Sequence, residues 1–555
     1  MVDRIFGLFR KEWTHLTDAA LLLALFALLS QLLALVRDRI FAHTFGASHV
    51  LDMYYAAFRI PDLLFATIAS FVSAAVIIPL FVERSEHSTE DARAFLGRIL
   101  AAFLFVAGCI AAVVSVAMPF LADRFFPEFV GVSQGVFIEL SRIMLLSPIL
   151  LGVSSILGSV AQSNKKFFVY ALSPVVYNVG IILGVLLFYP FWGMRGLALG
   201  VVLGAFFHMV VNIPALSAVA PRLVLKGAFD DIKSVITLSL PRTVGLSLGQ
   251  ITLFALVVWA AMLPEGSVAI FNFALNLQSV PLAIIGVSFS VAAFPTLARL
   301  YSEKNMAAFL DHVLGAARQI IFWSLPATAL FVVLRAQIVR VILGSGSFDW
   351  TDTKLTAATL ALFTLSLAAQ GLILLFVRGY YAAGNTKTPL IANVAGALGT
   401  MVFAVMLLGE FTHVAGFKTA VEHFLRVDGL PGTNVLMLSL AYTIGSILNA
   451  VILMRLFARD FDTKGALRRT AIESAGAALA IGTVGYLSLN VLSYFFALTT
   501  FLGIFLQGLF AGIAGIAAGI AFLRTIKNRE YEEISRSLHA RFWKGSIVVP
   551  DTQEL

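Results

Sequence analysis

AALLLALFALLSQLLALV, at residues Ala19–Val36, is a nearly uninterrupted apolar run close to the N-terminus. A helix needs roughly 20 apolar residues to cross the hydrocarbon core of a bilayer. A cleaved secretory signal would end at a site of small residues, whereas this run is followed by Arg37, Asp38 and Arg39. We therefore expect Ala19–Val36 to be a first transmembrane helix that is retained in the protein.

The composition of the whole chain points the same way. Of its 555 residues, 59% are hydrophobic and only 13% are charged, against about 45–50% and about 25% in soluble domains. So few charges cannot cover a water-soluble fold of this size, which predicts an all-α polytopic membrane protein. The net charge of +8 is typical of cytoplasmic loops, so no nucleic-acid partner is expected. The single cysteine, Cys109, excludes an intrachain disulfide, and the nine scattered histidines predict no metal site.

A span-length window predicts about fourteen transmembrane helices. They centre near residues 27, 70, 108, 147, 178, 205, 250, 283, 325, 364, 398, 444, 480 and 511. Basic residues gather in the loops after even-numbered spans, such as Lys165–Lys166 and Arg468–Arg469, and are sparse after odd-numbered ones. The positive-inside rule then predicts a multi-pass protein of the bacterial cytoplasmic membrane with both termini in the cytoplasm.

An internal repeat organises these spans. Ser73–Pro79 (SAAVIIP) resembles Ser290–Pro295 (SVAAFP), and Gln162–Lys166 (QSNKK) resembles Ala383–Lys387 (AGNTK). The offsets are 281 − 61 = 220 for two prolines, 387 − 166 = 221 for two lysines and 250 − 31 = 219 for two glutamines. Such an offset covers about six helices, an even number, so the two copies share one orientation in the membrane.

The predicted organisation therefore has five parts. A cytoplasmic amphipathic leader (1–16) precedes an N-terminal six-helix lobe (17–220) and a C-terminal six-helix lobe (230–460). Two extra helices (467–524) and a cytoplasmic tail (525–555) follow. Two such lobes are expected to enclose a central cavity at their interface, where a substrate would bind. The longest outer loop, residues 410–434, suggests no function.

Charged residues within the spans are costly in lipid, about 2.5–3.5 kcal/mol each, and so mark cavities or ion pairs. The candidates for a substrate-binding cavity are Arg37, Asp38, Arg59, Arg242, Gln31, Gln250 and Asn276. The alternative makes some of these charges structural: Arg37–Asp38 would be a pair at a span end, and Glu139–Arg142 an ion pair on one helix face. No arrangement of a nucleophile with a base, or of paired carboxylates, predicts an enzyme.

Four stretches resemble one family, the MurJ/MviN lipid II flippases. They are VRDRIFAHTFGASHVLDMYYAAFRIPDLL (Val36–Leu64), ALSPVVYNVGIILG (Ala171–Gly184), LPRTVGLSLGQITL (Leu240–Leu253) and RGYYAAGNTKTP (Arg378–Pro389). The resemblance implies fourteen helices in two lobes, with the last two helices forming a groove for a lipid tail. It also implies that the chain flips the undecaprenyl-pyrophosphate-linked peptidoglycan precursor, lipid II, to the outer leaflet by alternating access. Arg37 and Asp38 take the family's charged positions in the first helix, and Arg59 its basic position before Ile-Pro.

The sequence also departs from the family pattern. Arginines that the family carries fall on Gln31 and Asn276, and Phe65 and Ala66 replace its basic residues after Ile-Pro. A flippase for another polyprenyl-linked oligosaccharide, a cation-coupled small-molecule exporter and a non-transporting scaffold for cell-wall enzymes therefore remain alternatives. No cofactor is expected, and the energy source is either the membrane potential or a cation gradient. A monomer suffices for transport, and association with cell-wall synthases is compatible with the function.

Overall fold

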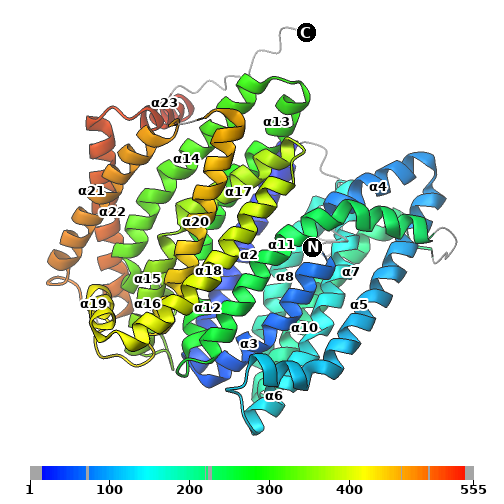
Figure 1. Cartoon of the computed structure of the whole chain (residues 1–555), viewed down its shortest axis with the longest axis horizontal. Helices are drawn as coiled ribbons and strands as arrows, with labels where there is room; N and C mark the ends of the chain where they lie inside the picture. The colour runs from blue at the N-terminus through cyan, green and yellow to red at the C-terminus, as the bar shows by residue number, and fades with distance from the viewer. Residues whose placement is uncertain are drawn as a thin grey trace. The chain divides into compact units, whose positions relative to one another are not determined.

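The computed structural model describes residues 16–69, 74–218, 220–222, 228–463, 465–497 and 500–543, and every regular element in these ranges is a helix (Figure 1). The predicted all-α class is therefore confirmed. The amphipathic leader predicted over residues 1–16 lies outside the described ranges apart from Leu16, where the first described helix begins. Residues 544–555 of the predicted tail also lie outside them.

The elements in the first part of the chain follow one another with short connections. They are α2 (Leu16–Phe45), α3 (His49–Leu64), η1 (Phe65–Ala69), α4 (Ala74–His87), α5 (Thr89–Phe125), α6 (Val132–Met144), α7 (Leu146–Ser163), α8 (Phe167–Leu183), η2 (Gly184–Phe188), α9 (Tyr189–Trp192), α10 (Met194–Asn212) and η3 (Ile213–Ala218).

The remaining elements follow the same pattern. They are α11 (Ala228–Ala261), α12 (Ser267–Leu282), η4 (Ala283–Val287), α13 (Ser288–Ser302), α14 (Met306–Val333), α15 (Arg335–Ile342), α16 (Trp350–Thr364), α17 (Leu367–Ala382), α18 (Lys387–His413), α19 (Ala415–Leu425), α20 (Val435–Phe461), α21 (Arg468–Leu492), α22 (Phe501–Thr525) and α23 (Arg529–Trp543). The predicted outer loop, residues 410–434, thus contains a helix, α19.

Within the described residues, eleven helical stretches are long and apolar enough to cross a membrane, and the pair α16–α17, bent by 43°, makes twelve. The predicted count of fourteen is not confirmed. The two expected spans that fail the test are those near residues 70 and 250. The first carries Arg59 and Asp62 and includes residues outside the described ranges, and the apolar part of the second is limited to Ser247–Ala261. Several side chains of α11 just before Ser247 also lie outside what the structure describes, so neither span is tested over its full length.

The two predicted repeat copies share an unusual local feature. Pro61 near the end of α3 precedes the π-helical turn η1, and Pro281 near the end of α12 precedes the π-helical turn η4. The two turns start 283 − 65 = 218 residues apart, close to the predicted offset. A proline removes one helical hydrogen bond, and a π turn absorbs such a disturbance without ending the helix. The repeat is thus visible in backbone geometry as well as in sequence.

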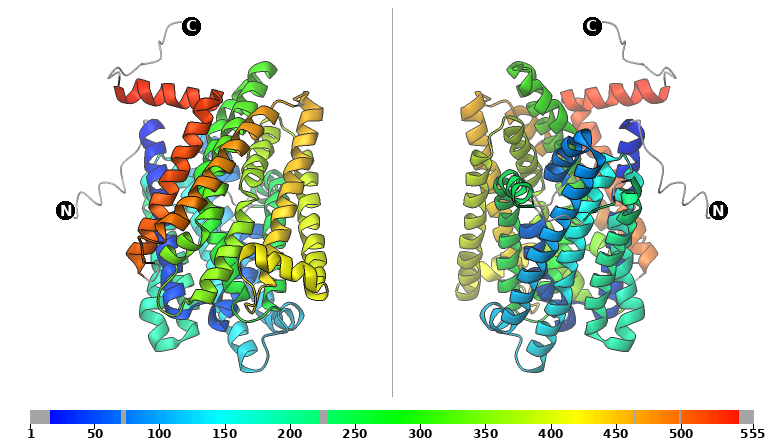
Figure 2. Two further views of the ribbon diagram at one scale, coloured as in Figure 1. Left: turned by 90° about the vertical axis from the view of Figure 1, so that its left-hand side faces the viewer. Right: turned by 90° about the vertical axis from the view of Figure 1, so that its right-hand side faces the viewer.

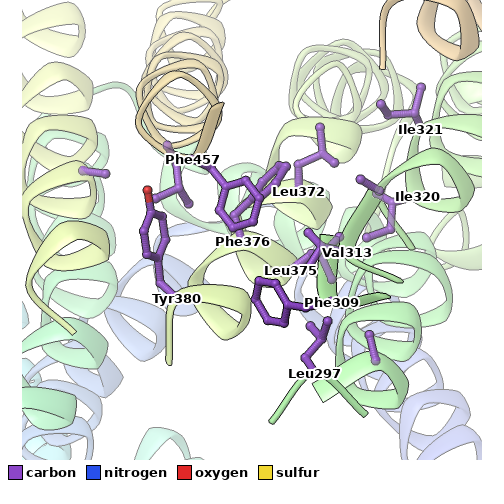
Figure 3. Close-up of a cluster of buried hydrophobic side chains, with 14 residues drawn as sticks. Leu297, Phe309, Val313, Ile320, Ile321, Leu372, Leu375, Phe376, Tyr380 and Phe457 are labelled. Carbon is purple, nitrogen blue, oxygen red and sulfur yellow. The ribbon is translucent and has the colours of Figure 1, made fainter. Parts of the chain in front are cut away.

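The helices cluster into two compact units, and each has its own apolar core. Unit 1 contains Met1–Leu277, Ile342–Thr359 and Asn393–Gly445, and unit 2 contains Gln278–Val341, Leu360–Ala392 and Ser446–Leu555. Unit 2 is built around Phe309, Phe376, Tyr380 and Phe457 from α14, α17 and α20 (Figure 3). These units are defined by contacts, and the boundaries of the lobes at 17–220 and 230–460 stay predictions.

Glycines bring α8 and α10 together in unit 1. A Cβ atom added at Gly180 would lie 2.3 Å from the Cα of Gly204, and one at Gly184 would lie 2.5 Å from the Cα of Gly200. The two glycines on each helix are four residues apart and therefore share one face. Small residues at this spacing let transmembrane helices approach closely, which fixes the position of Asn178 on α8.

The end of unit 2 is formed by α21, α22 and α23. The helices α21 and α22 run side by side, and α23 lies across the end of this pair (Figure 2). Thr470 of α21 donates a 2.8 Å hydrogen bond to Glu530 of α23, and Asn528 donates one of 2.6 Å to Glu473. The predicted tail therefore begins with a helix that is attached to the last two spans.

Candidate functional site

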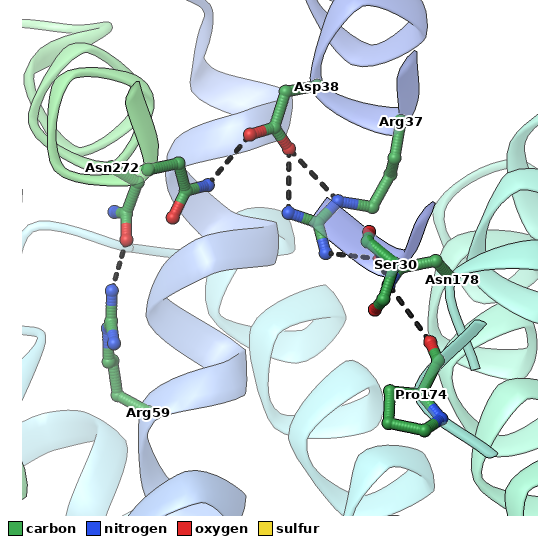
Figure 4. Close-up of polar contacts among 8 residues, drawn as sticks. Ser30, Arg37, Asp38, Arg59, Pro174, Asn178 and Asn272 are labelled. Atoms are coloured by element: carbon green, nitrogen blue, oxygen red, sulfur yellow. Dashed lines mark hydrogen bonds and ion pairs between the residues drawn. The ribbon is translucent and has the colours of Figure 1, made fainter. Parts of the chain in front are cut away.

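A buried network of polar side chains lies in unit 1, and its centre is the pair Arg37–Asp38 on α2 (Figure 4). Two nitrogens of the Arg37 guanidinium donate to the same carboxylate oxygen of Asp38, at 2.9 and 2.8 Å. The other oxygen of Asp38 accepts a 2.9 Å hydrogen bond from Asn276 of α12. The predicted pairing of Arg37 with Asp38 is confirmed, and Asn276 belongs to the same cluster.

Arg37 also fixes α2 against α8. Its third guanidinium nitrogen donates to the amide oxygen of Asn178 at 3.2 Å. The amide nitrogen of Asn178 donates in turn to Ser30 of α2 at 3.3 Å and to the carbonyl of Pro174 at 3.1 Å. All five donor positions of a guanidinium need acceptors or water when it is buried. Arg37 therefore has most of its hydrogen-bonding capacity committed to the protein.

Arg59 of α3 makes fewer side-chain hydrogen bonds than Arg37 does. One terminal nitrogen donates to the amide oxygen of Asn272 on α12, and the other lies 3.8 Å from a carboxylate oxygen of Asp62, one turn further along α3. Asn272 is oriented by its own 2.7 Å hydrogen bond to the carbonyl of Val268. The Arg59 side chain is 11% exposed, and its buried Nε has no hydrogen-bond acceptor among the described residues.

This free donor has a chemical consequence. A buried donor without an acceptor costs about 1–3 kcal/mol, and an oxyanion that reached Arg59 would satisfy it. The guanidinium fork matches phosphate oxygens in geometry as well as in charge. Arg59 is therefore suited to bind an anionic group, whereas Arg37 already has a buried counter-ion.

Asp52 anchors α3 to the start of α12. Its two carboxylate oxygens accept hydrogen bonds from the backbone N–H groups of Gly266 and Ala269, at 2.6 and 2.8 Å. Gly266 has a φ of +86°, and a Cβ atom there would lie 2.4 Å from the carbonyl oxygen of Ala47. A carboxylate at a helix N-terminus satisfies free N–H groups and is favoured by the helix dipole. This contact fixes the position of α12 along α3. Asn272 then lies next to Arg59, and Asn276 lies next to Asp38.

The other predicted site residues have different positions. Gln31 on α2 and Gln250 on α11 are partly buried. Arg242 lies in α11, and its side chain is outside what the structure describes. The predicted ion pair between Glu139 and Arg142 is wrong: Glu139 pairs with Arg195 at 2.7 Å, and Arg142 donates to the carbonyl of Ser115 at 2.9 Å. Arg195 lies in the first turn of α10, which packs against α6, and sequence spacing on α6 alone could not show this.

Two residues of this network, Asn178 and Asn272, are not among the site residues predicted from the sequence. Both are asparagines within apolar helices, where an amide must find a partner in the protein interior. That signal was available for both, but their partners lie 141 and 213 residues away in the chain. Within the described residues, no group of three or more His, Cys, Asp or Glu side chains could hold a metal ion.

Membrane-spanning helices that bury paired arginines, carboxylates and amides define a polytopic helical membrane protein of the transporter class. The particular family follows from comparison with known proteins. The family model described as "Lipid II flippase MurJ" matches residues 41–507. The chain belongs to this family.

Individual relatives support this assignment. The "Lipid II flippase MurJ" of Burkholderia cenocepacia is 25% identical over 401 residues, which cover 70% of this chain and 77% of that protein. The "Probable lipid II flippase MurJ" of Haemophilus influenzae is 26% identical over 433 residues, which cover 74% of this chain and 85% of that protein.

Solved structures show the same fold. A structure titled "Lipid II flippase MurJ, inward closed conformation" matches with a TM-score of 0.74 at 21% identity, over 92% of this chain and all of that one. An inward-facing multidrug resistance transporter of the MATE family matches with a TM-score of 0.61 at 14% identity, over 80% of this chain and 96% of that one. The predicted family is therefore confirmed.

Proposed function

We propose that this protein translocates lipid II, the undecaprenyl-pyrophosphate-linked peptidoglycan precursor, from the inner to the outer leaflet of the bacterial cytoplasmic membrane. Membership of the flippase family over residues 41–507 supports the substrate class. The observation that carries the proposal is Arg59, a buried guanidinium with a free Nε donor and a single distant counter-ion. A pyrophosphate offers the oxygen atoms that such a group lacks.

The two arginines take different roles in this proposal. Asp38 neutralises Arg37 through two short hydrogen bonds, and Asn178 takes up a third nitrogen. Arg37 therefore positions α2 against α8 and α12. Asp62 is 3.8 Å from Arg59 and its side chain is 33% exposed, so a pyrophosphate can displace it from the guanidinium. Arg59 is then the group that contacts the substrate.

The transport cycle is alternating access by the two predicted lobes. The protein acts as a monomer, and both of its termini lie in the cytoplasm. The membrane potential or a cation gradient supplies the energy. The extra helices α21 and α22 offer an apolar surface to the polyprenyl tail, with Leu479, Leu487 and Ile513 exposed along them. Association with cell-wall synthases would deliver the translocated precursor directly to its consumers.

The test is complementation of a bacterium depleted of its own lipid II flippase, with lipid II in the outer leaflet as the readout. The wild-type chain should restore outer-leaflet lipid II, and Arg59→Gln should abolish this at equal membrane expression. Arg299→Gln is the matched control. Arg299 also has one carboxylate at a similar distance, 3.9 Å from Glu303, but its side chain is 68% exposed. Failure of the wild-type chain despite correct insertion would refute lipid II as the cargo. Full rescue by Arg59→Gln would refute the role of Arg59.

A further inference from the structure

A cavity of about 350 Å³ opens in unit 2 beside the turn between α20 and α21. Its wall is apolar and comes from three helices: Leu314 of α14, Phe376 of α17, and Met454 and Ala458 of α20. Pockets for small organic ligands have volumes of about 300–1,000 Å³. The cavity is thus large enough for part of a lipid molecule, and the proposed translocation does not use it.

Two arginines, Arg455 and Arg468, line the same cavity. Both side chains are exposed, and within the described part of the chain neither side chain forms an ion pair or a hydrogen bond. The arginines next to them are paired: Arg459 lies 3.1 Å from Asp460, and Arg469 lies 2.6 Å from Glu473. The cavity therefore combines an apolar wall with two exposed cations that have no ion-pair partner within 4 Å among the described residues.

The start of α21 adds to this positive potential. The helix begins at Arg468, its first turn contains no acidic residue, and Leu467 before it provides no side-chain cap. The carboxylates of Glu473 and Glu530 lie close by, but they already accept hydrogen bonds from Arg469, Asn528 and Thr470. The N-terminus of a helix carries a partial positive charge, so an arginine there is unfavourable unless an anion is close. A phosphate at this position would interact with Arg455, Arg468 and the helix terminus together.

We propose that this cavity binds an anionic phospholipid, with its phosphate at Arg455 and Arg468 and one acyl chain along Phe376, Met454 and Ala458. Basic pockets between transmembrane helices on the cytoplasmic side hold anionic head groups, and the α20–α21 turn is on the predicted cytoplasmic side. The apolar wall favours a lipid over free phosphate, because inorganic phosphate would leave that wall in contact with water. The bound lipid would link α14, α17 and α20 to the start of α21.

The experiment uses the full-length protein in detergent micelles and counts bound lipids by native mass spectrometry. It is titrated with phosphatidylglycerol and with phosphatidylcholine of the same acyl chains. The double variant Arg455→Gln/Arg468→Gln should bind phosphatidylglycerol roughly thirtyfold more weakly than the wild type, since each basic residue near an anionic head group contributes about 1 kcal/mol. Arg459→Gln/Arg469→Gln removes the same net charge from the same turn and should bind phosphatidylglycerol as the wild type does.

A third variant separates lipid from free phosphate. Ala458→Trp fills the apolar part of the cavity and should weaken phosphatidylglycerol binding although both arginines are present. Equal binding of the two lipids, or equal loss in both double variants, would overturn the proposal. So would displacement of phosphatidylglycerol by millimolar inorganic phosphate with no effect of Ala458→Trp, which would indicate a site for a free anion. If Ala458→Trp unfolds in a thermal melt, the two double variants decide alone.

Discussion

The substitution Asp62→Asn removes the counter-ion of Arg59 and keeps the side-chain shape. Two unit charges at 3.8 Å interact by about 1 kcal/mol in a water-like medium and by about 4 kcal/mol at an effective dielectric constant near 20. Because the Asp62 side chain is 33% exposed, the lower value applies, as for other partly solvated pairs. An incoming pyrophosphate no longer has to displace this carboxylate, so its affinity should rise by ~1 kcal/mol, or roughly fivefold.

The assay is binding of undecaprenyl pyrophosphate to the purified full-length protein in lipid nanodiscs, followed by tryptophan fluorescence. Glu139→Gln is the control, because it also removes one carboxylate from an arginine, Arg195, at 2.7 Å. Its dissociation constant should equal that of the wild type. The double variant Arg59→Gln/Asp62→Asn should lose the gain. An unchanged or weaker affinity in Asp62→Asn, with the protein still folded, would refute the assignment of Arg59 as the pyrophosphate ligand.

Two further predictions concern stability. Asp52→Ala removes the acceptor for the N–H groups of Gly266 and Ala269 and should lower the free energy of unfolding by about 1–2 kcal/mol, as the loss of a helix cap does. In a thermal melt, Asp52→Ser should recover part of this loss. Equal melting temperatures of the wild type and Asp52→Ala would contradict the capping role. Gly180→Ala puts a methyl group against the backbone of α10 and should cost about 1–3 kcal/mol. Gly108→Ala is the same change on α5, with no atom within 4 Å of the new Cβ, so the melting temperature of this control should not fall. A similar loss of stability in both variants would show that the close approach of α8 and α10 does not cause the loss in Gly180→Ala.

Two prolines that suggested the internal repeat in the sequence occupy similar positions in the helices of the structure. Pro61 and Pro281 are separated by the expected offset, and each precedes a π-helical turn. This worked because a proline acts on its own helix, through a hydrogen bond that it cannot donate. The predicted spans near residues 70 and 250 are not confirmed, because part of each lies outside the residues that the structure describes.

Composition and local sequence by themselves determined the class of the protein. The shortage of charge required a membrane, the lengths of the apolar runs required helices, and the four motifs carried the family. Only the tertiary structure decided which polar groups meet. Asp38 and Asn276 lie 238 residues apart in the chain, and Arg59 and Asn272 lie 213 apart. A transmembrane helix is apolar both toward lipid and toward its neighbours, so its sequence pattern does not reveal which side faces the protein interior, and packing alone selects the partners.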